Sequence, residues 1–119
     1  MTQKAYIAAS FKRRDEILIA EKVLSPFFDI VSTWTKEVEV GYFDDVSNQR
    51  KATQDMYDLD RADMLIHFSN GEGCGNMTEL GIAINKGLKI VVIGQRKSIF
   101  HWLPSIEFYE TLEEYLCTI

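Results

Sequence analysis

A glutamate that follows a glycine-rich stretch is the residue of this sequence best placed to do chemistry. Glu79 comes after a loop that carries three glycines in alternation, Gly71, Gly73 and Gly75. Short apolar runs flank this region at 62–68 and 88–94, so the pattern predicts strand, loop, helix and strand. We therefore expect Glu79 in the first turn of a helix, just beyond the end of a buried strand, where open α/β sheets bind ligands.

This position predicts an ionised carboxylate. The positive end of a helix dipole stabilises such a group by roughly 0.3–1 kcal/mol. An ionised carboxylate in a cleft can attack an electrophilic sugar carbon, as in retaining glycoside cleavage, and a second carboxyl group then has to protonate the leaving group. The aspartate-rich segment before the third expected strand can supply that group, with Asp55 as the leading candidate and Asp60 and Asp63 behind it.

Structural roles for the same residues stay open on the sequence alone. The run Asn76-Met77-Thr78-Glu79 fits a capping box, in which Glu79 hydrogen-bonds back to the backbone of Asn76. Three glycines can simply form a tight turn, and a series of aspartates is typical of an exposed helix surface. Cys74 is a candidate nucleophile within the loop, but no histidine that could activate it is close in sequence.

Composition and motif spacing exclude several classes of ligand. The formal net charge of −5 leaves no basic stripe for polymeric nucleic acid. The glycine loop has neither the Gly-Lys-Ser/Thr ending of a Walker A loop nor the G-x-G-x-x-G spacing. The two histidines and two cysteines show no metal-ligand spacing, so we expect no metal. The cluster Lys12-Arg13-Arg14 suits either a phosphate at a helix start or a solvated helix face.

Cysteine usage and hydropathy predict a cytoplasmic protein. Cys74 and Cys117 do not make a disulfide framework, which fits reduced thiols. The N-terminal residues lack the charged, apolar and small-residue regions of a signal peptide. No apolar run approaches the length of a membrane span, so we expect no membrane partner.

Apolar runs alternate with amphipathic segments along the chain, which predicts a single α/β domain over residues 1–119. The expected fold is a flavodoxin-like (Rossmann-like) five-stranded parallel sheet with helices on both faces, in which the first and third strands are neighbours and the crevice opens at their C-terminal ends. The expected strands are 5–9, 30–34, 64–68, 89–93 and 105–108. The expected helices are 12–28, 47–62, 76–86, a single turn at 98–102, and 112–116. Residues 36–46 form either a loop over the site or include a strand at 38–42.

Within these elements, several side chains have a predicted environment. The helix 47–62 is expected to bury an apolar stripe of Ala52, Met56, Leu59 and Ala62. Tyr6 points inward on the first strand and belongs either to the core or, through its hydroxyl, to the crevice. His67 is expected to be a core histidine, and His101 is expected to pack within a loop.

Four parts of the sequence form a pattern larger than any single motif. They are 5–11 (Ala-Tyr-Ile-Ala-Ala-Ser-Phe), Asp55 eight residues before Asp63, 78–83 (Thr-Glu-Leu-Gly-Ile-Ala) and 87–90 (Gly-Leu-Lys-Ile). Together they resemble the nucleoside 2-deoxyribosyltransferase family, whose superfamily includes the deoxynucleoside 5′-monophosphate N-glycosidases. The resemblance runs over nearly the whole chain, and Glu-Leu-Gly-x-Ala is its most specific part.

The resemblance implies a double displacement. Glu79 would be the nucleophile that forms a covalent deoxyribosyl-enzyme, Asp55 would transfer a proton to the departing base, and Tyr6 would help to orient Glu79. The substrate would be a deoxynucleoside or its 5′-monophosphate, and the acceptor a free nucleobase in transferases or water in the N-glycosidases. The resemblance also implies a flavodoxin-like fold, no cofactor or metal, and a homo-oligomer in which a neighbouring subunit completes the site.

The substrate-binding residues that we expect lie in the loop after the first strand and in the glycine loop: Ser10, Phe11, Arg13, Asn70, Gly71, Glu72, Gly73, Gly75 and Asn76. Transferases of the family tend to carry an aspartate six residues before the glutamate. This chain has Gly73 there, so Glu72 or Asn70 is the candidate replacement. We favour a transferase over a hydrolase, and a non-catalytic nucleotide-binding module of the same fold is the alternative.

Overall fold

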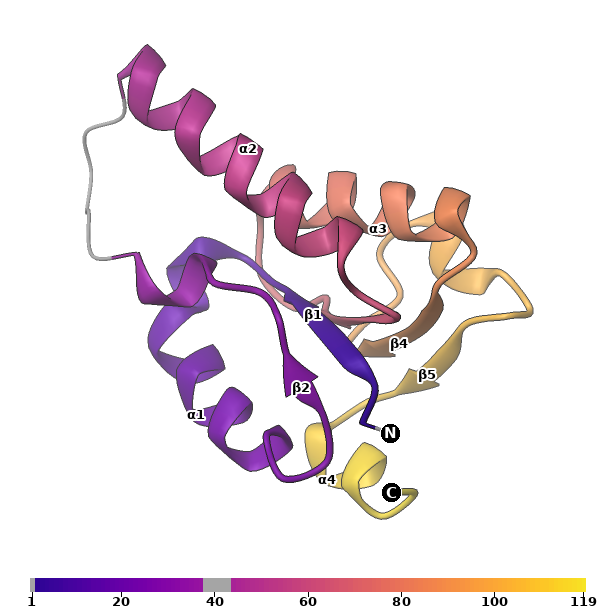
Figure 1. Ribbon diagram of the computed structural model, residues 1–119. Coiled ribbons are helices and arrows are strands. Elements are labelled where there is room, and N and C mark those ends of the chain that lie inside the picture. Colours follow the sequence, from indigo (N-terminus) through magenta and orange to yellow (C-terminus); the bar gives the residue numbers. More distant parts are fainter. Residues whose placement is uncertain (1, 38–43) are drawn as a thin grey trace.

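The computed structural model describes residues 2–37 and 44–119, which build a five-stranded parallel sheet in the order β2-β1-β3-β4-β5 (Figure 1). The strands are β1 (Lys4–Ala8), β2 (Asp29–Ile30), β3 (Met64–Phe68), β4 (Lys89–Ile93) and β5 (Glu107–Tyr109). All four neighbouring pairs run parallel. The predicted flavodoxin-like sheet, with the first and third strands as neighbours, is confirmed. The loop or strand predicted at 38–42 lies outside the described residues.

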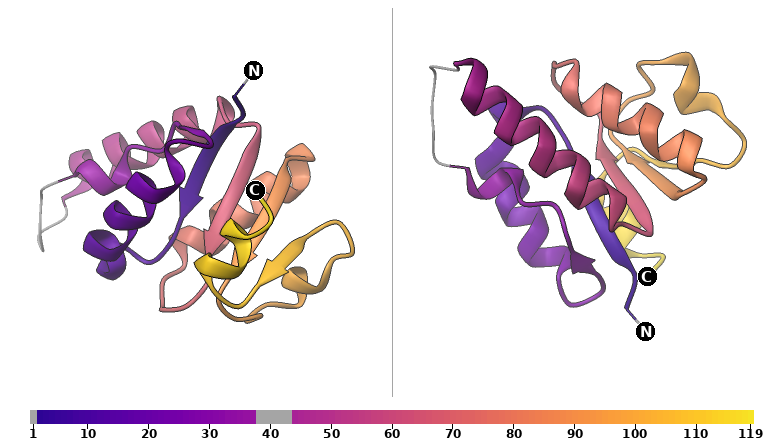
Figure 2. Two further views of the ribbon diagram at one scale, coloured as in Figure 1. Left: turned by 90° about the horizontal axis from the view of Figure 1, so that it is seen from below. Right: turned by 45° about the horizontal axis from the view of Figure 1, so that its top comes forward.

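Helices cover both faces of the sheet, as the sequence predicts. The helices are α1 (Arg14–Leu24), α2 (Asp45–Asp60), α3 (Gly75–Lys86) and α4 (Leu112–Leu116), with short 3-10 helices η1 (Phe11–Arg13), η2 (Trp34–Lys36) and η3 (Ile99–Trp102). α2 and α3 lie on one face, and α1 and α4 lie on the other (Figures 1 and 2). Among the described residues, no helix is both long and apolar enough to cross a membrane.

The central strands are buried because helices cover both of their faces. All five residues of β3 are buried, and β1 and β4 are buried except at their first residue. This explains why these runs lack a polar alternation in the sequence. Fully buried side chains such as Ile7, Leu65 and Ile66 each contribute roughly 1.5–3 kcal/mol to stability.

The second strand is shorter than the predicted segment 30–34, since β2 has only two residues. Beyond it, side chains replace the backbone ladder on β1. The backbone N–H of Ile7 donates to the hydroxyl of Ser32 (3.0 Å), and the indole Nε1 of Trp34 donates to the carbonyl of Ile7 (2.6 Å). Because these side chains satisfy the polar groups of β1, the main chain is free to turn into η2.

The first helix is shorter at both ends than the predicted segment 12–28. It begins as the 3-10 turn η1, and α1 ends at Leu24. Pro26 has no N–H to donate to the carbonyl of Lys22, and the hydroxyl of Ser25 donates to that carbonyl instead (3.1 Å). Pro26 therefore marks the place where α1 ends.

The N-terminal part of α2 projects beyond the sheet (Figure 1), and this changes which residues of the helix are buried. Leu59 and Ala62 are buried, as predicted. Ala52 and Met56 are exposed, so that part of the predicted stripe is wrong. The apolar stripe is covered only where the helix reaches the sheet, because burial needs a partner surface and not periodicity alone.

Asp58 is fully buried, although an aspartate series predicts an exposed helix surface. Its carboxylate accepts hydrogen bonds from the backbone N–H of Thr33 (3.1 Å), from the Thr33 hydroxyl (2.6 Å) and from the Gln54 amide (2.8 Å). A buried carboxylate persists only when its oxygens are bonded in this way. Asp58 therefore ties the segment after β2 to α2.

Replacing Asp58 by Ala should lower the free energy of unfolding by about 3 kcal/mol, because hydrogen bonds to a charged group are lost and Thr33 is left unpaired. The control is Asp60→Ala, since the carboxylate of Asp60 is exposed and pairs with Lys86 at the surface, and this variant should change stability little. Urea unfolding followed by circular dichroism measures both variants. Equal losses would contradict the tethering role of Asp58.

Candidate active site

A cavity of about 660 Å³ opens at the C-terminal ends of β1 and β3. This is the switch point of the sheet, since the chain proceeds from β1 to β2 on one side while β3 pairs on the other. The walls come from the segment after β1, from the glycine loop with the start of α3, and from α2. The predicted site residues that line the cavity are Ser10, Phe11, Asp55, Glu72, Gly73, Gly75, Asn76 and Glu79.

Tyr6 of β1 contacts Glu79 of α3. Its side chain is fully buried in the core of the sheet, and its hydroxyl donates a hydrogen bond to Oε2 of Glu79. Both alternatives for Tyr6 therefore apply at once, because the ring belongs to the core while the hydroxyl reaches a cavity residue. Burial, with the carboxylates of Glu79 and Asp55 nearby, raises the pKa of Tyr6. The hydroxyl thus keeps its proton and remains a donor.

Glu79 does not cap its helix. α3 begins at Gly75, and Cys74 occupies the N-cap position without a side-chain cap. Glu79 consequently lies in the second turn and not in the first, and its carboxylate bonds to Tyr6. The capping-box interpretation and the predicted place in the first turn are both wrong, and the carboxyl group is available to the cavity.

Burial, and not the helix dipole, governs the ionisation of Glu79. Burial raises the pKa of this carboxyl group to about 8, while the hydrogen bond from Tyr6 lowers it and the Asp55 carboxylate raises it. The dipole favours ionisation by only roughly 0.3–1 kcal/mol, and its effect falls off after the first turn. The prediction of an ionised Glu79 at neutral pH is therefore wrong, because desolvation of a carboxylate outweighs the dipole.

Asp55 of α2 lines the same cavity and has a pKa raised to about 6. Burial is the main cause, and the charges of Asp58 and Glu37 add to it. Between about pH 6 and about pH 8, Asp55 and Glu79 together carry one proton and one negative charge. Two carboxyl groups whose environments separate their pKa values can exchange a proton with a substrate, and the values here leave the shared proton mainly on Glu79.

The other candidate acids lie away from the cavity. Asp60 pairs with Lys86 at the surface (2.8 Å), and Asp63 accepts a hydrogen bond from the backbone N–H of Lys4 (3.0 Å). Both are next to the N-terminal ends of the strands, which is the edge opposite the cavity. Within residues 2–37 and 44–119, no group of three or more His, Cys, Asp or Glu side chains is arranged to hold a metal ion.

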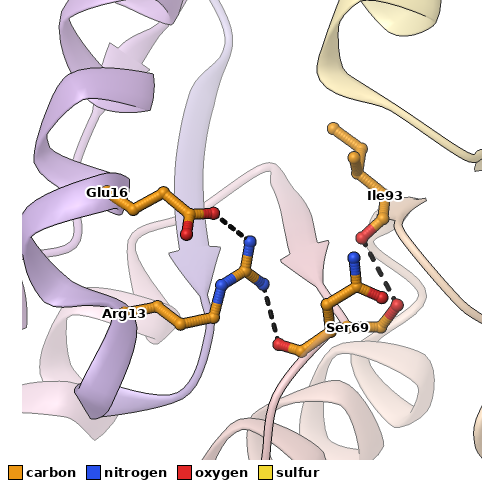
Figure 3. Close-up of polar contacts among 5 residues, drawn as sticks. Arg13, Glu16, Ser69 and Ile93 are labelled. Carbon is orange, nitrogen blue, oxygen red and sulfur yellow. Dashed lines mark hydrogen bonds and ion pairs between the residues drawn. The ribbon is translucent and has the colours of Figure 1, made fainter.

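Arg13 and the first half of the glycine loop do not line the cavity. The guanidinium of Arg13 donates to the carbonyl of Asn70 (2.7 Å) and pairs with Glu16 (Figure 3). Gly71 has a φ of +100°, which favours glycine, and a Cβ atom there would lie only 3.1 Å from Cδ of Arg13. The sequence predicts substrate contacts for Arg13, Asn70 and Gly71, but the structure uses them to tether the glycine loop to the start of α1.

Two further side chains, those of Ser69 and Lys97, hold the glycine loop. The hydroxyl of Ser69 lies 3.3 Å from the carbonyl of Ile93 (Figure 3) and 2.5 Å from that of Gln95. The ammonium group of Lys97 donates to the carbonyl of Gly71 (2.6 Å). The loop therefore leaves the sheet from a fixed point, and its second half faces the cavity.

Five residues of the cavity wall are absent from the predicted site residues: Ala9, Lys12, Trp34, Asn48 and Cys74. Lys12 belongs to the basic cluster 12–14 noted in the sequence, whereas Trp34 lies at the end of the predicted strand 30–34. The rings of Phe11 and Trp34 have centroids 6.2 Å apart and form an aromatic surface beside the cavity. An aromatic residue at the C-terminal end of a short strand is the signal that could have indicated Trp34.

Comparison with known proteins defines the class of fold and no family. No family model matches the chain, and no curated protein matches it. Among solved structures, the chain is similar to the crystal structure of a conserved protein from Enterococcus faecalis V583. The TM-score is 0.66 at 15% sequence identity, and the match covers 99% of this chain and 96% of that chain. At this identity the similarity shows a shared fold, the flavodoxin-like α/β class.

Replacing Glu79 by Gln should remove part of the pH dependence of stability. Folded Glu79 keeps its proton up to about pH 8, whereas the unfolded chain releases it near pH 4.5. The folded state therefore binds more protons between these values, and the free energy of unfolding falls as the pH rises. Gln retains an acceptor for Tyr6 and carries no charge. The variant should thus gain stability over the wild type from about pH 4.5 to about pH 8.

Urea unfolding of both proteins at these two pH values measures the effect. Glu113→Gln, on the exposed side of α4, is the control and should keep the wild-type pH dependence. Parallel pH profiles for wild type and Glu79→Gln would show that Glu79 is ionised in the fold.

Proposed function

We propose that the protein is an N-glycosyl-bond enzyme that acts on deoxynucleosides or their 5′-monophosphates through a covalent glycosyl-Glu79 intermediate. The observation that carries this proposal is the hydrogen bond from buried Tyr6 to Glu79, at a cavity that Asp55 lines from the facing helix. The site thus combines a supported nucleophile with a proton donor. Within this class we propose a nucleoside 2-deoxyribosyltransferase reaction, with hydrolysis of the same bond as the alternative.

The first displacement starts from the minor form of the carboxyl pair, in which Glu79 is ionised and Asp55 holds the shared proton. A carboxylate oxygen of Glu79 attacks C1′ of the sugar, and the bond from C1′ to the base nitrogen breaks. The electron pair of that bond goes to the base, and the carboxyl group of Asp55 supplies the proton. Tyr6 donates to Oε2 of Glu79, which leaves Oε1 for the attack. The hydrogen bond also favours the ionised form of Glu79, because it lowers the pKa of that group.

In the second displacement, a nitrogen of the acceptor base attacks C1′ and the bond to Glu79 breaks. The carboxylate of Asp55 takes the proton that the acceptor releases, so both carboxyl groups return to their starting states. Water in place of the base gives free sugar and completes a hydrolysis. The scheme balances with these two carboxyl groups alone and calls for no cofactor.

The walls of the cavity suit a nucleoside. Phe11 is exposed and packs at a tilt against buried Trp34, so its ring offers an aromatic surface on which a nucleobase can stack. Lys12 lines the same wall and has no ion-pair partner among the described residues, so its charge is available to a 5′-phosphate. These features support a substrate with an aromatic base and accommodate either a nucleoside or its monophosphate.

Glu72 is the better candidate to contact the base. It lines the cavity, whereas Asn70 does not. Gly73 has a φ of +126°, a conformation that L side chains rarely adopt. An aspartate at that position would be strained in this loop, which accounts for the glycine and supports the neighbouring carboxylate as its replacement.

We also propose that the enzyme is a cytoplasmic homo-oligomer. Apolar side chains are exposed along α2, with exposed fractions of 76% for Val46, 52% for Met56 and 61% for Tyr57. Exposed apolar surface of this kind is typical of protein contacts, and α2 also carries Asp55. Cys74 and Cys117 are both free and exposed, which suits a reducing compartment.

A non-catalytic nucleotide-binding module is the second candidate. The raised pKa of Glu79 favours it, since little of the nucleophile is ionised at neutral pH. Alkylation of the two free cysteines can report binding. Cys74 lines the cavity, whereas Cys117 lies near the C-terminus, and both are exposed. A nucleotide that slows alkylation of Cys74 but not of Cys117, without any release of base, would favour the module.

Glu79→Gln should reduce turnover by about 10⁴-fold or more, because it removes the nucleophile. The assay incubates the protein with deoxynucleosides and their 5′-monophosphates, with and without a second free base, and follows the products by chromatography. Glu113→Gln, on the exposed side of α4, should keep wild-type turnover. Base exchange that needs the acceptor identifies a transferase, and release of base without it identifies a hydrolase. Full turnover in Glu79→Gln would exclude the mechanism.

The pH profile of kcat/KM should be bell-shaped, with limbs near pH 6 and near pH 8, because the reaction needs one carboxylate and one carboxylic acid. Tyr6→Phe removes a hydrogen bond that lowers the pKa of Glu79. The alkaline limb should therefore move to higher pH, and the rate at the optimum should fall because fewer molecules carry their charge on Glu79. An alkaline limb that stays in place would show that Tyr6 does not act on Glu79.

A further inference from the structure

Two buried histidines connect the candidate active site to the segment after β4. His67 of β3 and His101 of η3 are 0% and 1% exposed, so both are buried as predicted. Nε2 of His101 lies 3.1 Å from Nδ1 of His67. Nε2 of His67 in turn lies 2.9 Å from Oδ1 of Asn76, which lines the cavity. We call the chain from His101 through His67 to Asn76 the histidine relay.

Only one arrangement of protons satisfies the histidine relay. The backbone N–H of Lys97 points at Nδ1 of His101 (2.9 Å), and a backbone N–H can only donate. The ring proton of His101 is therefore on Nε2, from which it is donated to Nδ1 of His67. Since Nδ1 of His67 accepts, its own ring proton is on Nε2 and is donated to Oδ1 of Asn76.

An additional proton has no place in the relay. A proton on Nδ1 of His67 would face the N–H of His101, and a proton on Nδ1 of His101 would face the N–H of Lys97. Burial lowers the pKa of His67 to about 4, and it lowers the pKa of His101 as well. Both rings are therefore neutral at neutral pH, and the relay keeps one fixed direction.

The relay decides the orientation of the Asn76 amide. Because Oδ1 accepts from His67, the NH₂ group is turned to the other side, where it donates to the carbonyl of Gly73 (3.3 Å). An amide NH₂ group has two hydrogens, so one remains for a ligand. Asn76 and Glu79 are three residues apart on α3 and lie on the same side of the helix.

On the basis of the function proposed above, we propose that His67 is a positioning residue, which orients Asn76 so that its free N–H donates to an oxygen of the nucleoside held against Glu79. A flipped amide would turn its carbonyl to that oxygen and repel it. His101 acts one step further back, because it sets the tautomer of His67. The orientation of the N–H donor beside Glu79 is therefore set by His67 and His101, two residues that do not contact the substrate.

NMR of the imidazole nitrogens tests the relay without any substrate. We expect both rings to be neutral and protonated on Nε2 over the range from neutral pH to about pH 8, where the carboxyl pair shares one proton. A proton on Nδ1 of either ring, or a charged ring in this range, would overturn the relay whatever reaction the protein catalyses.

A double-mutant cycle on kcat/KM tests the positioning role. His67→Leu should lower kcat/KM about tenfold when Asn76 is present, through misplacement of one substrate contact. In the Asn76→Ala background it should have no further effect, because His67 acts through Asn76. His67→Gln offers both a donor and an acceptor and should restore most of the loss. Equal effects of His67→Leu in both backgrounds would overturn the proposal.

Ile66→Val controls for general loosening of β3. Ile66 is buried beside His67 in the strand, but alternation places its side chain on the opposite face of the sheet. This variant should leave kcat/KM unchanged, and an equal loss in Ile66→Val and His67→Leu would reduce His67 to a packing residue.

Failure of the proposed function and failure of the relay are distinguishable. If no nucleoside is turned over while NMR finds the expected tautomers, the proposed function fails and the relay stands. The cycle is then measured by hydrogen exchange of the backbone amides of 73–76, where the same non-additivity between His67→Leu and Asn76→Ala is expected. Additive effects there would overturn the positioning role.

Discussion

The hydrogen bond from Tyr6 to Glu79 joins the centre of the sheet to the helix that forms a wall of the cavity. This contact requires that the Tyr6 ring lies in the core and that the Glu79 side chain of α3 points toward the sheet. Burial of the Glu79 carboxyl group there raises its pKa to about 8. An acidic group in such a place opposes folding at alkaline pH. Burial of the apolar strands around Glu79 offsets this cost in stability.

Three carboxyl groups on neighbouring elements have separate roles because their surroundings differ. Asp58 is buried with three hydrogen bonds and holds α2 to the segment after β2. Its charge raises the pKa of Asp55, one turn earlier on the same helix. Asp55 faces the cavity and titrates near the pH at which a proton donor is useful. The carboxylate of Asp58, which holds the fold together, thus also raises the pKa of Asp55 in the cavity that contains the candidate nucleophile Glu79.

The glycine loop is held from several directions before it meets a ligand. Arg13 of η1 donates to the carbonyl of Asn70, and Lys97 after β4 donates to that of Gly71. His67 of β3 contacts Asn76 at the end of the loop. In the proposed reaction, such preorganisation would reduce the cost of placing a substrate against Glu79. These contacts belong to this chain's own residues, whereas the shared flavodoxin-like fold is compatible with many functions. The function proposed here therefore depends on the site and not on the fold.

The sequence by itself determined the order of strands and helices, the parallel sheet and the place of the cavity, because apolar runs, glycines and helical spacing are local signals. It also indicated Glu79 and Asp55 as residues of one site. Only the tertiary structure decided that Glu79 keeps its proton to about pH 8, that Arg13 turns away from the cavity, and that His67 meets His101 across 34 residues of chain. Burial and long-range contact set these properties, and neither is encoded in a local pattern.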